Sequence, residues 1–106
     1  MKKIFLSLIG IFVINACSST NLPFNELEVN LNQKYGVITN EYYKMLENPI
    51  VEEDRKIILN KFENFRKEVR DLKLNRRKQS LNEITLLNSF INKSTINIQY
   101  LNDLGE

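Results

Sequence analysis

The chain has 106 residues, of which 42% are hydrophobic and 26% charged, a balance typical of a folded domain and not of a disordered segment. With one cysteine and no histidine, it can form neither an intramolecular disulfide nor a Cys/His metal site. Its net charge of +2 equals the contribution of Lys2 and Lys3, so the rest of the chain is nominally neutral and has no overall electrostatic attraction for nucleic acid.

The N-terminal segment has the parts of a bacterial export signal. Lys2 and Lys3 form a positive start, and residues 4–14 form an apolar run that stops at Asn15. About 20 apolar residues are needed to span a bilayer, so this shorter run predicts a cleaved segment and not a transmembrane helix. We therefore expect residues 1–16 to be a signal peptide.

The four residues Ile14-Asn15-Ala16-Cys17 resemble the lipobox of bacterial lipoproteins, in which a small residue directly precedes the cysteine. The resemblance implies cleavage between Ala16 and Cys17 and a diacylglyceryl group on the Cys17 thiol, with or without an N-acyl group. Each buried methylene contributes about 0.8 kcal/mol, so two or more acyl chains hold a protein stably on a membrane. Residues 17–23 are then the acylated cysteine and a short polar tether, and no cofactor is expected.

A first helix is predicted over residues 24–47. Its apolar residues recur at seven-residue spacing with others beside them, and the stripe consists of Phe24, Leu27, Leu31, Tyr35, Ile38, Tyr42 and Met45. Gly36 interrupts the helix at a cost of up to about 1 kcal/mol relative to alanine.

Four tyrosines offer a recognition surface, Tyr35, Tyr42, Tyr43 and Tyr100. Because Tyr35 and Tyr42 lie beside the apolar stripe, core packing is favoured for those two.

A second helix is predicted over residues 49–76, with Asn48 as its N-cap and acidic residues 52–54 near the positive end of its dipole. Its apolar residues alternate spacings of four and three, as in a coiled-coil seam, and they are Val51, Ile58, Phe62, Phe65, Val69 and Leu72. Continued further, this register places Arg76, Gln79 and Glu83 on the seam. The stripe therefore ends between residues 75 and 80.

A third helix is predicted over residues 81–103, because a new stripe begins there and consists of Ile84, Leu87, Ile91, Ser94, Ile98 and Leu101. Ser80 and Glu83 match a capping box, which favours a separate helix start. The alternative is one long helix from Pro49 to Asp103 with a shifted register, since no glycine or proline forces a turn. Both alternatives are all-α over residues 24–104: an antiparallel helical hairpin, or a small three-helix bundle or coiled coil.

Seven basic residues are concentrated around the end of the second helix, against only Glu68 and Asp71, and they are Arg66, Lys67, Arg70, Lys73, Arg76, Arg77 and Lys78. They suit contact with an anionic surface such as lipid headgroups, at about 1 kcal/mol for each residue. Alternatively they form a solvated helix end that the dipole favours and that pairs with acidic residues 52–54 of another copy.

The sequence contains no arrangement typical of a catalyst, such as a histidine, a glycine-rich phosphate loop or a nucleophile elbow, so we expect no enzyme activity. The leading hypothesis is a lipid-anchored helical protein of the bacterial envelope that acts by protein–protein contact, as a structural component or a surface binding module. A lysis (spanin-like) or exclusion lipoprotein of a phage or plasmid is the alternative. A ligand carrier is a third class, for which so small a helical body offers little interior volume.

The expected partners are the membrane, through the lipid anchor, and a second copy or another helical envelope protein, because one amphipathic helix cannot bury its own apolar face. Ser18 replaces the aspartate that retains enteric lipoproteins in the inner membrane, which favours the outer membrane. The lipobox and the Lys, Asn and Ile bias are similar to small spirochaetal and fusobacterial lipoproteins. The Pro-broken helices over residues 24–104 resemble FadA-like helical adhesins, which implies a helical hairpin.

Overall fold

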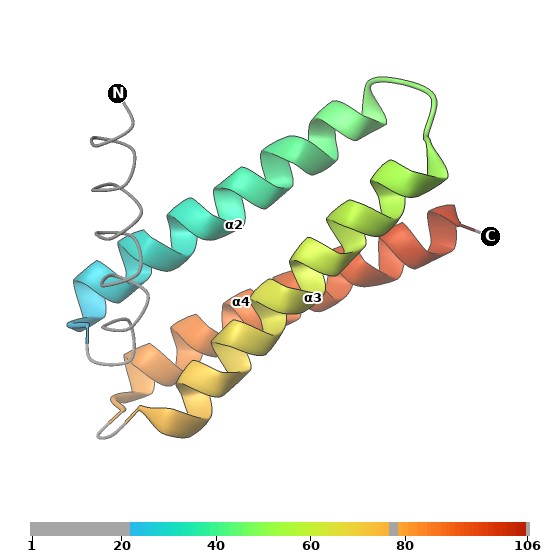
Figure 1. Cartoon of the computed structure of the whole chain (residues 1–106). Helices are drawn as coiled ribbons and strands as arrows, with labels where there is room; N and C mark the ends of the chain where they lie inside the picture. The colour runs from blue at the N-terminus through green and yellow to red at the C-terminus, as the bar shows by residue number, and fades with distance from the viewer. Residues whose placement is uncertain (1–21, 77–78, 106) are drawn as a thin grey trace, which may run out of the picture.

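The computed structural model describes residues 22–76 and 79–105. It contains three helices, α2 (Phe24–Leu46), α3 (Glu52–Asn75) and α4 (Leu81–Leu104), and no strand among the described residues. The chain runs along α2, returns along α3 and turns again into α4, which lies beside α3 (Figure 1). The prediction of an all-α, small three-helix bundle is confirmed, and the alternative of one long second helix is wrong.

The predicted start of the second helix is wrong by three residues. The Asn48 backbone N–H donates to the Met45 carbonyl at 3.3 Å, so Asn48 belongs to the end of α2 and is not an N-cap. Val51 is the N-cap instead, and its carbonyl accepts the first helical hydrogen bond, from Arg55 N–H at 3.0 Å. This later start places acidic residues 52–54 in the first turn, where the helix dipole favours them.

The turn between α3 and α4 is built from the polar residues that interrupt the predicted seam. Gln79 donates from Nε2 to the Arg76 carbonyl at 3.0 Å, which caps the end of α3. Ser80 accepts the Glu83 N–H on its hydroxyl at 3.2 Å, so it caps α4 as predicted. The Glu83 carboxylate pairs with the nearly buried Arg76 guanidinium at 3.1 Å. The chain therefore turns here without glycine or proline.

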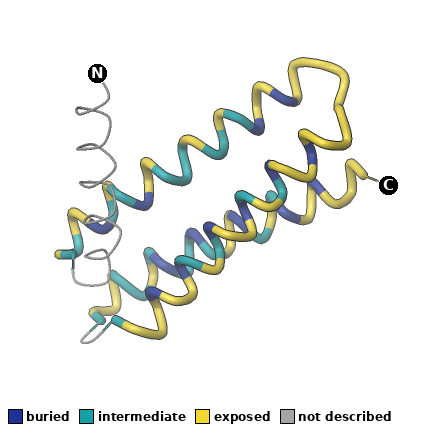
Figure 2. The backbone as a smooth tube through the Cα atoms, in the orientation of Figure 1, coloured by how far each residue is buried: buried dark blue, intermediate teal, exposed yellow. Residues whose placement is uncertain are grey.

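The core consists of two clusters of buried side chains that line the inner faces of the three helices (Figure 2). The cluster near the α3–α4 turn contains Leu27, Leu31, Phe65, Val69, Leu72, Leu87 and Phe90. The cluster near the α2–α3 turn contains Tyr42, Met45, Ile58, Phe62, Ile98 and Leu101. Tyr35 and Ile38 pack against both clusters and join them.

Two positions differ from the predicted core. Val51 is 54% exposed because it precedes the first turn of α3. Arg55, the next position in the same register, is buried in its place and donates from Nη1 to the Leu101 carbonyl at 3.0 Å and from Nε to Glu52 at 2.8 Å. A guanidinium at this point satisfies a carbonyl near the negative end of the α4 dipole.

The apolar face of α4 is rotated slightly from the predicted stripe. Phe90 is buried and meets Phe65 edge to face, with ring centroids 5.8 Å apart, whereas Ile84 and Ile91 are only half-buried. The ring of Phe90 also lies 5.7 Å from that of Tyr35. These aromatic contacts bring three helices together, and they favour the rotation because such pairs add about 0.5–1.5 kcal/mol beyond the area they bury.

Candidate functional site

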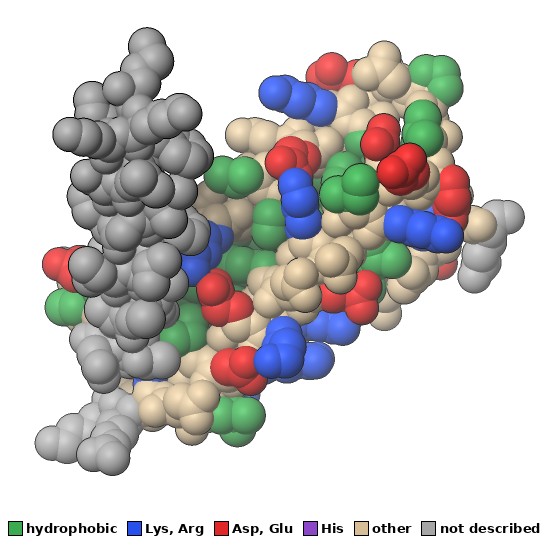
Figure 3. All heavy atoms as spheres, viewed as in Figure 1, with side chains coloured by type: hydrophobic (Ala, Val, Ile, Leu, Met, Phe, Trp, Pro, Cys, Tyr) green, Lys and Arg blue, Asp and Glu red, His purple; other side chains and the backbone are tan. Residues whose placement is uncertain are grey.

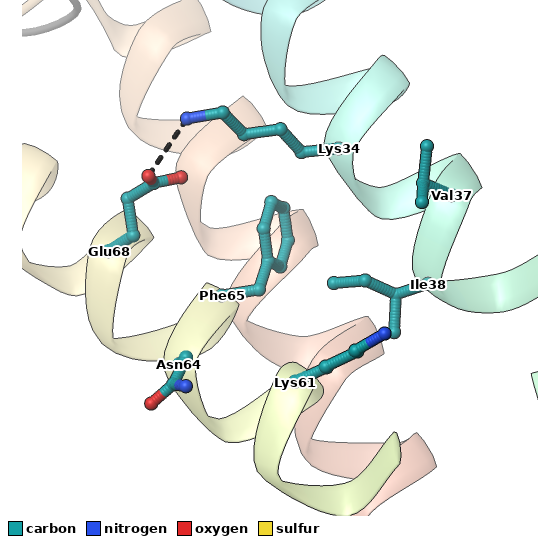
Figure 4. A pocket seen from close by; sticks show the side chains of 7 residues that line it. All are labelled: Lys34, Val37, Ile38, Lys61, Asn64, Phe65 and Glu68. Carbon is teal, nitrogen blue, oxygen red and sulfur yellow. Dashed lines mark hydrogen bonds and ion pairs between the residues drawn. The ribbon is translucent and has the colours of Figure 1, made fainter. Parts of the chain in front are cut away.

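An open groove runs between α2 and α3, and we call it the α2/α3 groove. Its central hollow has a volume of about 370 Å³ and is lined by Lys34, Val37, Ile38, Lys61, Asn64, Phe65 and Glu68 (Figure 4). A second hollow of about 440 Å³ lies toward the α2–α3 turn, where Met45, Val51 and Ile57 line it. Lys61 lines both hollows, so they adjoin at this residue, and the α2/α3 groove includes both.

The floor of the groove is apolar. Phe65 is buried and Ile38 half-buried beneath it, and their side chains point toward one another (Figure 4). Ile38 faces the core. Val37 precedes it by one residue, which is a rotation of about 100° around the helix, so its side chain is 60% exposed. Hydrophobic side chains gather between α2 and α3 on this face of the molecule, with charged side chains beside them (Figure 3). The groove therefore offers a partner apolar surface that the three helices do not bury.

Two ion pairs join α2 to α3 across the groove. Lys34 Nζ lies 2.8 Å from Glu68 Oε1, and Lys61 Nζ lies 2.7 Å from Glu41 Oε2. All four side chains are partly exposed, so each pair contributes at most about 1 kcal/mol to stability. Their main effect is to fix the register of the two helices and the pattern of charge that a partner meets.

The four tyrosines divide into two pairs. Tyr35 accepts a hydrogen bond from Asn97 Nδ2 at 2.8 Å, and burial raises its pKa although this hydrogen bond opposes the rise. Tyr42 is buried against Phe62 with ring centroids 5.9 Å apart, and burial, followed by the nearby Tyr43 and Tyr100, raises its pKa. Tyr43 and Tyr100 are exposed. The structure thus places Tyr42 in the core and packs the partly buried Tyr35 against it, as the sequence favours.

The predicted basic segment is used in part to hold α3 against α4. Three of its residues donate hydrogen bonds to α4: Arg66 to Thr95 at 3.2 Å, Lys73 to Asn88 at 2.8 Å and Arg76 to Glu83 at 3.1 Å. Lys67 is exposed and pairs with Asp71 on its own helix at 3.1 Å, and Arg70 is exposed. Arg77 and Lys78 lie outside the described residues, as do Ala16 and Cys17 of the lipobox.

In the described part of the chain, no group of three or more acidic, histidine or cysteine side chains is arranged to hold a metal ion. None of the helices described there is long and apolar enough to cross a membrane. No family model, no curated protein and no solved structure matches this chain. The function proposed below is therefore supported by the residues of this chain alone.

Proposed function

We propose that this chain is a small lipid-anchored protein of the bacterial envelope that works by contact with another protein and catalyses no reaction. The observation that carries the proposal is the lipobox ending at Cys17, which directly follows a positive and an apolar segment of signal-peptide length. Acylation at Cys17 leaves the helical body, residues 24–104, outside the cytoplasm and attached to a membrane by the tether.

The α2/α3 groove supplies the contact surface in this proposal. Val37, Val51 and Ile57 are each about half-exposed or more around it, on a face whose floor is apolar. Small-molecule sites enclose most of their ligand, whereas this groove is open along one side and lies between two antiparallel helices. Such a shape suits the apolar side chains of a partner helix laid along it.

The anchor is tested by replacing the acylated residue. Cys17→Ala should abolish incorporation of labelled palmitate, because it removes the thiol that carries the diacylglyceryl group. Ser18→Ala, one residue further along, is the matched control and should label normally. An unlabelled wild-type protein, or a Cys17→Ala protein that still incorporates palmitate, would overturn the proposal.

The side of the membrane is tested by protease treatment of intact cells, with a periplasmic protein as the marker. Rapid loss of the helical body with an intact marker assigns it to the cell surface as a binding module. Protection of both proteins on intact cells, followed by loss of both after osmotic opening of the outer membrane, assigns it to the periplasm as a structural component. If the helical body survives protease both on intact cells and after osmotic opening of the outer membrane, it lies in the cytoplasm, which would contradict the export signal.

A further inference from the structure

We infer that the α2/α3 groove is covered by the same groove of a second copy, in a two-fold dimer whose axis runs along the helices. The dimer follows from the charge pattern of the groove. The direction of its axis rests on the proposed function, because a shared membrane fixes which ends of the two chains lie together.

The four charges of the two ion pairs across the groove form a two-by-two pattern of alternating sign. Lys34 and Glu41 are seven residues apart on α2, and Lys61 and Glu68 are seven apart on α3, which is about two helical turns in each case. Because the helices are antiparallel, Lys34 faces Glu68 at one end and Glu41 faces Lys61 at the other. Each charge therefore has a neighbour of opposite sign along its own helix and another across the groove.

This pattern is complementary to itself. An axis along the helices places Lys34 over the partner's Glu68 and Glu41 over the partner's Lys61. An axis across the helices places Lys34 over the partner's Glu41 and Lys61 over the partner's Glu68. Each of these four charges meets its opposite in both cases, and an isologous interface needs a patch with this property. If each helix carried a single sign of charge, the axis across the helices would instead place like charges over one another, which is costly at an interface.

The apolar part of the groove lies between the two ion pairs. Val37 follows Lys34 by three residues and precedes Glu41 by four, so it stands near the centre of the pattern. In the dimer it enters the partner's hollow, whose floor is apolar in the same way. A two-helix face about 34 Å long and about 20 Å wide covers about 700 Å² for each partner, close to the 800 Å² of a standard interface.

The membrane selects between the two axes. Both chains are anchored through Cys17, which precedes α2, so both copies of α2 point the same way from one membrane. An axis along the helices keeps the two α2 directions the same, whereas an axis across them reverses one. The dimer of two anchored copies therefore places each α2 over the partner's α3.

The first test compares two valines on one helix. Val37→Glu introduces a charge at the centre of the groove, and Val29→Glu introduces the same charge at a residue that is 57% exposed but not among those lining the groove. Sedimentation equilibrium of the mature lipidated protein in density-matched detergent should show a dimer for the wild type and for Val29→Glu. Val37→Glu should raise the dissociation constant about tenfold or more with unchanged helicity.

The second test determines the axis with the double variant Lys34→Glu and Glu68→Lys. This exchange keeps both ion pairs within each chain, but it makes the charges of α2 negative and those of α3 positive. The dimer should persist at its wild-type dissociation constant if the axis runs along the helices, because α2 then still faces the partner's α3. It should dissociate if the axis runs across them, since Glu41 would then face a like charge, and that result overturns the inferred axis.

The anchor and the dimer are measured separately on the same sample. Palmitate content reports the anchor, and the molecular mass from sedimentation equilibrium reports the dimer. A palmitoylated wild-type monomer at about 100 μM chain overturns the dimer and leaves the proposed function standing. An unacylated dimer that Val37→Glu disrupts overturns the anchor and leaves the groove contact standing. A dimer that Val37→Glu and Val29→Glu leave equally intact assigns the interface to another face and overturns the inference.

Discussion

Replacing Ser94 by alanine should stabilise the protein. Ser94 is fully buried at the centre of the α4 face, and its hydroxyl has no hydrogen-bond partner. A buried polar group without a partner costs about 1–3 kcal/mol, and alanine forms helices better than serine by about 0.5 kcal/mol. Loss of one oxygen atom leaves a small cavity that offsets about 0.5 kcal/mol of this gain. We therefore expect the free energy of unfolding to rise by about 1–3 kcal/mol.

The assay is urea unfolding of the mature protein, followed by circular dichroism at the helical band. Ser89→Ala on the same helix is the control, because Ser89 is only half-buried and its replacement reports the helix propensity alone. Ser94→Ala should exceed this control by about 0.5 kcal/mol or more. If Ser94→Ala lowers the stability, the hydroxyl is hydrogen-bonded in solution and the reasoning is refuted.

Three further substitutions test other parts of the bundle. Gly36→Ala should stabilise α2 by about 0.5–1 kcal/mol in the same urea assay, because a Cβ at this position meets nothing within 4 Å, and a loss of stability would contradict this packing. The Arg55 hydrogen bond lowers the pKa of Glu52, so this carboxylate adds stability above its unfolded pKa that is lost as the pH falls through the lowered value. In an NMR titration, Arg55→Gln should return this pKa to the ordinary range, and an unchanged value would refute the pair. Burial raises the pKa of Tyr35, so its contribution to stability is complete below its unfolded pKa and is lost as the pH rises through the raised one. Tyr35→Phe should remove one late-ionising phenol from the ultraviolet titration, and an unaltered curve would count against the burial of that hydroxyl.

The helices were predictable because their apolar faces repeat with helical spacing. The stripe from Ile58 to Leu72 is buried throughout, and Ser80 caps α4 as its spacing from Glu83 indicates. The break between α3 and α4 was less certain from sequence, since no residue in it forces a turn. The polar side chains decide it: Gln79 caps the end of α3, and Arg76 pairs with Glu83 of α4, a contact that requires both helices.

The burial of Arg55 and the exposure of Val51 were not predictable from the hydrophobic pattern alone. A pattern search favours the apolar residue, and an arginine is rarely buried unless its charge is paired. Its burial depends on the Leu101 carbonyl, 46 residues later in the chain, and on the position of Glu52 in the first turn. Both conditions require the assembled bundle.

The groove was missed for a similar reason. Val37 was absent from the predicted apolar stripe. It directly precedes Ile38 and is apolar on a flank of the helix where polar residues are expected. That departure and the apolar Ile57, which also lies outside the predicted stripes, are the signals in the sequence. The pairing of Lys34 with Glu68 and of Lys61 with Glu41 depends on how α2 and α3 are aligned, which the periodicity of a single helix does not determine.

Mass spectrometry of the N-terminal peptide from the membrane fraction detects the lipid anchor itself. We expect the mature chain to begin at Cys17 and to carry the mass of a diacylglyceryl group on its thiol, with or without one further acyl group on the amine. A chain that keeps residues 1–16, or one that begins at Cys17 with a free thiol, would contradict this expectation.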